Sequence, residues 1–160
     1  MAGPERVVFD CNVFLQALIS DQGPAAHCFE AAQTGHVTLY YSQEILAEFA
    51  DVALRPKIVQ RFGITAEAVE LFTELIEGAG KLIESVPQVF HYERDPKDAH
   101  YVDLAVAILA NLVVSRDRDL LALNDPEAPE REVLAQLGCD LVVVTPVGLL
   151  ERLEKPGDNE

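Results

Sequence analysis

Residues 7–12 read Val7-Val8-Phe9-Asp10-Cys11-Asn12, a short apolar run that ends in an acidic residue. Such a run is typical of a parallel strand that is buried on both faces. The arrangement returns at residues 112–117, where Leu-Val-Val is followed by Ser-Arg-Asp. The carboxyl ends of neighbouring parallel strands meet at one edge of a sheet, and ligands of open α/β sheets bind there. The two stretches therefore predict an α/β fold with acidic residues gathered at one sheet edge.

Strand and helix signals alternate along the whole chain, which indicates an α/β fold with a mainly parallel sheet. We expect about five strands flanked by helices in three α/β/α layers. They form a single domain over residues 1–154, followed by a polar C-terminal tail over residues 155–160. The expected strands cover residues 6–10, 37–41, 81–86, 112–115 and 141–144. The expected helices cover residues 13–20, 24–34, 43–53, 57–62, 66–77, 96–111, 119–123, 130–137 and 146–153.

The composition is that of an ordinary globular domain, with 160 residues of which 49% are apolar. No apolar run approaches the roughly 20 residues that a membrane-spanning helix needs. Residues 1–6 lack the basic and then apolar pattern of a secretory signal, so we expect a cytoplasmic protein. Three cysteines, Cys11, Cys28 and Cys139, are widely spaced and odd in number. We expect them to be reduced and buried, since neither a disulfide framework nor a zinc site fits that spacing.

The net charge is −15, from 27 Asp and Glu residues against 12 Lys and Arg residues. Affinity for a polyanion normally draws on clustered cations, so we expect weak intrinsic binding of nucleic acid, or a basic partner. A cation bound at the acidic sheet edge would offset part of this charge. The side chains expected to contact phosphate come from two of the basic groups in the chain: Arg55 and Lys57, and Arg116 and Arg118.

Four acidic residues far apart in the sequence are expected to converge at the sheet edge: Asp10, Glu48, Asp98 and Asp117. Crowded carboxylates raise one another's pKa and destabilise the fold unless a cation neutralises them. Mg²⁺ or Mn²⁺ is the usual cation of a site built from oxygen ligands. Asp119 adds a second acid beside Asp117 and is a further expected metal ligand. The pattern predicts a metal-dependent hydrolytic site that acts on phosphodiesters.

Each acid also has a structural interpretation that the sequence leaves open. Asp10 would cap the helix that follows it, and Glu48 would belong to a solvated acidic helix face. Asp98 would complement the dipole of its helix while Asp95 caps it, and residues 115–119 would form a charged surface loop. The joint placement favours the metal site, because four separate alternatives would otherwise have to hold together.

Two further polar residues near these acids carry weaker expectations. Asn12 is a neutral donor and acceptor, and we expect it to position water or to hold Asp10. Asp103 lies within the apolar helix that Asp98 opens. At the helical spacing it points about 140° away from Asp98, so it is not an expected ligand.

Four segments of the chain resemble the PIN-domain family. They are the Val-Val-Phe-Asp-Cys-Asn-Val-Phe-Leu run, the helix around residues 45–51 with Arg-Pro-Lys after it, Asp95-Pro96-Lys97-Asp98, and Val-Val-Ser-Arg-Asp-Arg-Asp-Leu-Leu. The resemblance runs from about residue 7 to about residue 150. It looks closest to the bacterial branch that comprises toxin components of toxin–antitoxin systems.

The resemblance implies a Mg²⁺- or Mn²⁺-dependent endoribonuclease that cuts single-stranded RNA. By motif position, the catalytic and metal-binding acids fall on Asp10, Glu48, Asp98 and Asp117. Asp119 matches a second acid, and Ser115 matches the small hydroxyl residue that precedes it. Cys11 departs from the Thr that the family usually has, which removes an expected supporting hydrogen bond.

The expected partners are an RNA substrate, a small basic antitoxin and a second copy of the chain in a homodimer, although the residues themselves do not set the oligomeric state. A stand-alone RNA-processing nuclease is the alternative within the same chemistry. An aspartyl-phosphate phosphatase is disfavoured, because its second Asp would occupy the position of Asn12. A non-catalytic, protein-binding module is also open, although the four acids argue against a degenerate site.

Overall fold

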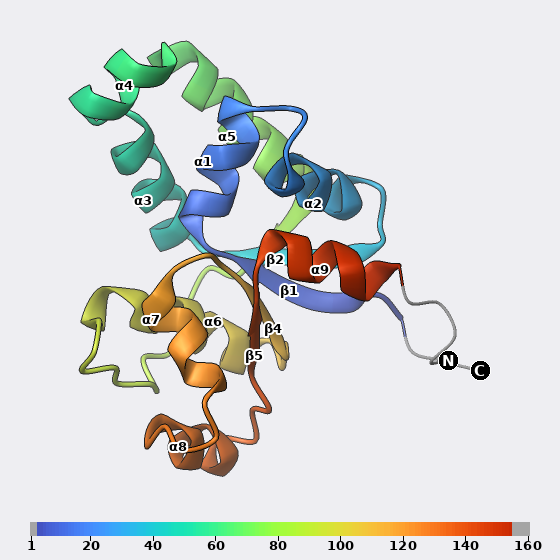
Figure 1. The fold of residues 1–160 in the computed structure, drawn as a ribbon, viewed down its shortest axis with the longest axis vertical. Coiled ribbons are helices and arrows are strands. Elements are labelled where there is room, and N and C mark those ends of the chain that lie inside the picture. The colour runs from blue at the N-terminus through green and yellow to red at the C-terminus, as the bar shows by residue number, and fades with distance from the viewer. Residues whose placement is uncertain (1–2, 155–160) are drawn as a thin grey trace.

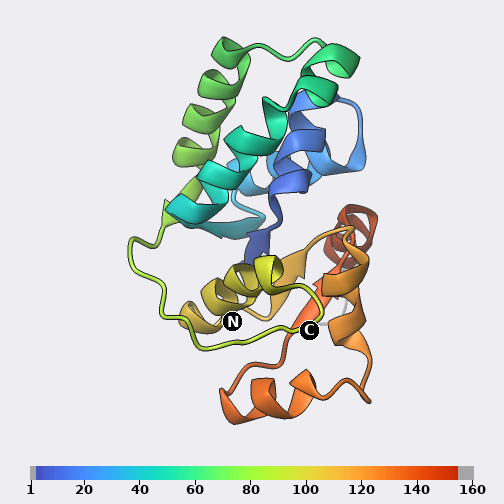
Figure 2. The same cartoon turned by 90° about the vertical axis from the view of Figure 1, so that its left-hand side faces the viewer.

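The fold is a five-stranded sheet with helices on both faces, as a computed structural model describes it for residues 3–154 (Figures 1 and 2). All four strand pairs are parallel, in the order β3-β2-β1-β4-β5. The strands are β1 (Glu5–Phe9), β2 (Val37–Tyr41), β3 (Gly80–Leu82), β4 (Leu112–Val114) and β5 (Val142–Val144). The expected α/β fold is thereby confirmed. The polar tail expected at residues 155–160 lies outside the described residues.

The order of the strands places the acidic sheet edge at a topological switch point. From the central β1 the chain moves outward to β2 and β3, and then returns to add β4 and β5 on the other side. The register pairs Phe9 with Val114. Asp10 continues this pairing, because its backbone N–H donates to the Val114 carbonyl at 3.0 Å. The residues that follow β1 and β4 therefore emerge side by side, where open α/β sheets bind ligands.

The helices between β1 and β3 lie on one side of the sheet (Figure 2). They are α1 (Cys11–Ile19), α2 (Pro24–Gln33), α3 (Gln43–Ala53), α4 (Pro56–Phe62) and α5 (Ala66–Ala79). Beneath them lies an aromatic cluster whose neighbouring rings are 5.0–6.2 Å apart between centroids: Phe9, Phe14, Phe29, Phe49 and Phe72. Offset and edge-on ring contacts at these distances stabilise a core beyond the burial of apolar area. The base of the acidic edge is therefore rigidly supported from this side.

The opposite face is covered by the second half of the chain, in which α6 packs on β1 and β4. Its elements are η1 (Pro96–Asp98), α6 (Ala99–Ala107), α7 (Arg118–Leu121), η2 (Ala122–Asn124) and α8 (Glu130–Gln136). The last helix, α9 (Pro146–Leu153), packs against α2 (Figure 1). Within residues 3–154, no helix is long and apolar enough to cross a membrane.

Two elements end several residues before the predicted position. The strand expected over residues 81–86 ends at Leu82, and Pro87 soon follows, which cannot donate to a sheet ladder. The helix expected to reach residue 111 ends at Ala107, since Leu109 adopts a left-handed backbone with φ of 55°. The Ala110 N–H then donates back to the Ala105 carbonyl, as in a Schellman helix end.

Asp103, for which the sequence suggested no role, anchors the long loop that connects β3 to η1. Its side chain is only 4% exposed, and its Oδ1 accepts hydrogen bonds from the backbone N–H groups of Val89 and Phe90 at 2.9 and 2.8 Å. Hydrogen bonds to a charged acceptor are stronger than those between neutral groups. Asp103 therefore supports the loop that leads to Asp95 and is not part of the acidic cluster.

Candidate metal centre

Asp10 lies at the C-terminal end of β1 and is both the cap of α1 and a buried member of the acidic edge. Its Oδ1 accepts from the backbone N–H of Asn12 at 2.9 Å, and its side chain is only 3% exposed. The capping interpretation is thus correct, but it does not exclude a role in the site. Asn12 holds Asp10 through its backbone N–H, and the expected role of its side chain in positioning water stays a prediction.

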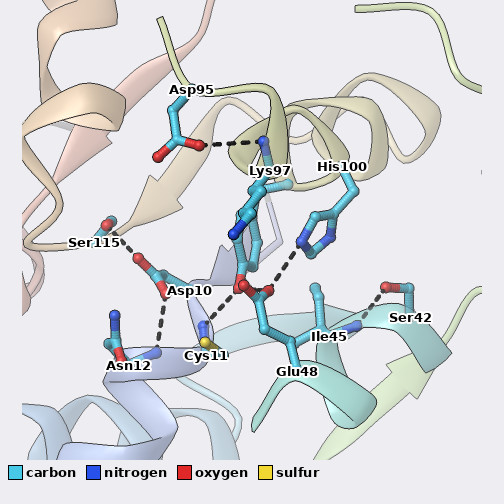
Figure 3. A network of polar contacts seen from close by, with 11 residues as sticks. Asp10, Cys11, Asn12, Ser42, Ile45, Glu48, Asp95, Lys97, His100 and Ser115 are labelled. Atoms are coloured by element: carbon cyan, nitrogen blue, oxygen red, sulfur yellow. Dashed lines mark hydrogen bonds and ion pairs between the residues drawn. The ribbon is translucent and has the colours of Figure 1, made fainter. Parts of the chain in front are cut away.

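Ser115 joins the end of β1 to the end of β4. Its fully buried hydroxyl donates to Asp10 Oδ2 at 2.6 Å (Figure 3). The same hydroxyl accepts from the Asp117 N–H at 2.9 Å. Asp117 in turn caps α7 by accepting from the Asp119 N–H at 2.8 Å. Three residues that the sequence assigned to the site, Asp10, Ser115 and Asp117, are therefore linked in one hydrogen-bonded chain.

Glu48 reaches the edge from the middle of α3 and is held by two side chains of α6. Its Oε1 accepts from His100 Nε2 at 3.0 Å (Figure 3). It also accepts from the Tyr101 hydroxyl at 2.6 Å. The same Tyr101 hydroxyl accepts from the Cys11 N–H at 3.0 Å, next to Asp10. Sequence reasoning missed Tyr101 and His100, because a tyrosine and a histidine in an apolar helix first suggest core packing. They fix where the Glu48 carboxylate lies.

Asp98 belongs to a second and tighter group of acids than the sequence predicts. Among residues 3–154, the acids whose ligand atoms all lie within 4.8 Å of one another are Asp95, Asp98 and Asp119. The five expected ligands do not form one such group, and Asp95 was taken as a cap only. Asp95 does cap η1, accepting from the Lys97 N–H at 3.2 Å. The i, i+3 spacing of Asp95 and Asp98 is the signal that could have revealed the pair.

Electrostatic interactions tie the two groups together through Asp98. Burial, followed by the charges of Asp117, Asp95 and Asp10, raises the pKa of Asp98 to about 8. Burial also raises the pKa of Asp10, and the charges of Asp117 and Glu48 add to this, although the bonds from Ser115 and Asn12 oppose it. Mutual repulsion of this kind is what a bound cation relieves.

The pKa of Glu48 is lowered, in contrast to the raised pKa values of Asp98 and Asp10. Burial alone would raise its pKa, but the hydrogen bonds from His100 and Tyr101 and the electrostatic effects of His100 and Arg55 outweigh it and lower the pKa. Burial, followed by the charge of Asp10, keeps the pKa of Tyr101 far above its ordinary value, so the phenol retains the proton that it donates to Glu48. Glu48 is therefore an ionised, oriented carboxylate at the edge of the site.

One direct observation supports a hard divalent cation as the ligand of the Asp95–Asp98–Asp119 group. The Oδ2 atom of Asp98 is buried and has no hydrogen-bond partner among the described residues. A buried carboxylate oxygen without a donor is costly, and it ordinarily implies an ion or a water that satisfies it. All surrounding ligand atoms are carboxylate oxygens, which is the donor set of Mg²⁺ and Mn²⁺ rather than of softer metals.

One basic residue outside the expected phosphate contacts reaches the acids. Arg94 pairs with Asp119, since its Nε donates to Asp119 Oδ1 at 2.6 Å. Arg55 is engaged by Asp51 at 3.1 Å on the exposed face of α3. Arg94 closes the Asp95–Asp98–Asp119 group from outside and is a functional candidate that the sequence analysis missed.

The cysteines are free and buried, as expected. Burial raises the pKa of both Cys11 and Cys28 to about 12, so these thiols are protonated and take no part in ligation. Cys11 serves the site through its backbone N–H, which the Thr expected at that position would also supply.

Fold and site together define an α/β domain with an acidic edge at the switch point of a parallel sheet. A family model of the PIN domain matches residues 6–119. The chain therefore belongs to the PIN-domain family. The match spans every acid of the site, from Asp10 to Asp119. The chain is also 27% identical over 150 residues to an uncharacterized protein of Methanocaldococcus jannaschii, with 94% of this chain and 92% of that protein aligned.

Raising the pH should destabilise the metal-free protein. Because the folded-state pKa of Asp98 is about 8 and its ordinary value is 3.8, the folded protein retains a proton that the unfolded chain has released. The free energy of unfolding therefore falls between about pH 4 and pH 8, by at least about 1 kcal/mol. Asp98→Asn removes the titrating group and should flatten this decline. Urea unfolding in EDTA across that pH range measures the free energy of unfolding of both proteins.

The matched control for this experiment is Asp51→Asn, which removes a carboxylate that is exposed on α3. Its pH dependence should follow that of the wild type. A decline of equal slope in the wild type and in Asp98→Asn would show that Asp98 is not the group responsible.

Proposed function

We propose that this PIN domain is a Mg²⁺- or Mn²⁺-dependent endoribonuclease that hydrolyses phosphodiester bonds of single-stranded RNA. The observation that carries the proposal is the buried, unpartnered Oδ2 of Asp98, placed among the charges of Asp95, Asp117 and Asp10. Membership of a family that commonly comprises nucleases supports the same chemistry. The assigned catalytic acids are Asp10, Glu48, Asp98 and Asp117.

The residues of the chain have distinct tasks in this proposal. Asp95, Asp98 and Asp119 would hold a cation through their closely spaced oxygens. Asp10 is kept in place by Ser115, and Glu48 by Tyr101 and His100, so neither carboxylate has to be reoriented when RNA arrives. A bound divalent cation would lower the pKa of a water and stabilise the charge that develops on the phosphate. Preorganised carboxylates are what such a reaction requires.

Cleavage of a fluorophore-labelled single-stranded RNA by the purified protein tests the proposal. We expect product in millimolar Mg²⁺ or Mn²⁺ and none in EDTA, with activity restored when metal is added back. RNA with a base-paired duplex of the same sequence serves as the comparison substrate and should be cut more slowly. Cleavage that continues unchanged in EDTA would exclude the mechanism.

We also propose that the domain acts as a toxin held inactive by a small basic antitoxin, and that it forms a homodimer. The net charge of −15 supports a basic partner. So does the position of the acids along one edge, where a basic segment could lie across Glu48 and Asp117. A stand-alone RNA-processing nuclease remains the alternative.

Co-expression with the gene directly upstream tests the partner. If the proposal holds, the protein expressed alone slows growth, and a small basic protein co-purifies and restores it. Salt screens the charges between the partners, so their affinity should fall as the salt concentration rises. It should also fall with Mn²⁺, because cation and basic side chain compete for the same acids. A chain that neither slows growth nor retains a basic partner is a stand-alone nuclease.

A further inference from the structure

A polar pocket of about 280 Å³ lies beside the acidic edge, between the beginning of α3 and the η1–α6 segment. The loop that Asp103 anchors closes it from a third side. Its lining offers hydrogen-bond donors and acceptors from exposed side chains: Glu44, Gln88, His91 and Lys97. Two rings, those of Phe90 and His100, also contribute to its walls.

His100 connects this pocket to the acidic site. Its Nε2 donates to Glu48 Oε1 at 3.0 Å, while the ring also lines the pocket. Figure 3 shows the ring reaching toward Glu48, with Ser42, another lining residue, on its other side. The Nδ1 atom of the ring is buried and has no partner among the described residues. This unpaired atom thus belongs to a ring that also lines the pocket, and leaving such an atom without a partner is costly.

We propose that the pocket binds one base of the RNA, in the nucleotide next to the phosphodiester that is cleaved. This inference rests on the proposed ribonuclease function and names the part of the substrate that determines specificity. Single-stranded RNA is recognised through bases that are splayed out, stacked on aromatic or histidine rings and hydrogen-bonded along their edges. The pocket supplies rings for stacking and polar side chains for hydrogen bonds to the edge of a base.

The charge of the lining favours a base over a phosphate. Phosphate is contacted chiefly by cations and N–H donors. Here the cation Lys97 is accompanied by the exposed carboxylate of Glu44, and Gln88 can both donate and accept. Such a mixture matches the alternating donors and acceptors of a base edge. The volume lies near the lower end of the roughly 300–1,000 Å³ of small-ligand pockets, so it suits one base rather than several.

The position of the pocket sets which nucleotide would occupy it. Lys97 lies between Asp95 and Asp98 in the sequence, and His100 touches Glu48, so the pocket shares walls with the acidic site. A base held here leaves its own backbone at the acids. Base identity would thus influence which bond is cut, although the acids themselves contact only phosphate and cation.

The test uses the double variant Gln88→Ala/His91→Ala, which changes two exposed loop side chains outside the acidic cluster. The matched control is His27→Ala/Gln33→Ala, the same pair of residue types exposed on α2. Binding of four fluorescein-labelled hexanucleotides, each of one base and each 2′-O-methylated to prevent cleavage, is measured by anisotropy in Mg²⁺. Thermal melts confirm that both variants are folded.

We expect the wild type and the control to prefer one base, and the pocket variant to lose affinity for that oligonucleotide by about five- to a hundredfold. No base preference in the wild type, or an equal loss for all four oligonucleotides, would overturn the inference. Unchanged RNA binding with impaired capture of the basic partner would also overturn it and assign the pocket to protein recognition. Because the probes cannot be cleaved, a failure of the ribonuclease proposal shows up separately, in the cleavage assay.

Discussion

Asp10→Asn is expected to reduce RNA cleavage by at least about a hundredfold, since a metal centre commonly supplies several kcal/mol of transition-state stabilisation. The side chain keeps its shape, and Asn caps helices as well as Asp does. Its amide can still accept from the Asn12 N–H and can donate to Ser115 Oγ, so the two observed hydrogen bonds can both be replaced. What disappears is one negative charge of the acidic edge.

The same substitution should leave the metal-free protein as stable as the wild type, or more stable. Burial and the neighbouring acids raise the pKa of Asp10, which means that its ionised form is disfavoured in the fold. Single-turnover cleavage in Mn²⁺ and urea unfolding in EDTA give the two readouts. Asp51→Asn, which removes an exposed carboxylate of α3, should change neither. A variant that unfolds more easily without metal yet still cuts RNA would reduce Asp10 to a helix cap.

Divalent cations should stabilise the folded protein by about 2.7 kcal/mol at a concentration one hundred times the dissociation constant. For a chain of this size that corresponds to a rise in melting temperature of roughly 5–10 °C. The physical reason is that binding relieves the repulsion around Asp98 and satisfies its buried Oδ2. Calorimetric melts in EDTA and in millimolar Mg²⁺ or Mn²⁺ measure the shift.

The control for this experiment is Asp98→Asn, which removes the charge at the centre of the cluster. Its melting temperature should depend much less on metal than that of the wild type. If neither cation raises the melting temperature of the wild type, the acidic edge is not a metal centre. A rise that persists in Asp98→Asn would place the bound cation elsewhere on this acidic surface.

Much of the fold could be predicted from short segments. Some signals act over only a few residues, so the local sequence is enough to predict the element. Examples are the apolar runs of β1 and β4, the cap Ser42 before α3, and the Asp-Pro pair at the start of η1. The predicted ends of β3 and α6 were wrong. The sequence of one strand does not reveal how far it stays paired with the neighbouring strand of the sheet. The helix end was missed because Leu109 adopts a left-handed backbone without the glycine that usually signals one.

The sequence by itself determined the order of the elements along the chain and the position of Asp10 and Asp117 just after a strand, because both follow from local patterns. Only the tertiary structure decided how the acids are grouped and held. Glu48 meets a tyrosine 53 residues away, Asp119 meets an arginine 25 residues before it, and Ser115 joins two strand ends 105 residues apart. Such pairings depend on how α3 and α6 pack on opposite faces of one sheet edge. No local pattern encodes a hydrogen bond between side chains that only packing brings together.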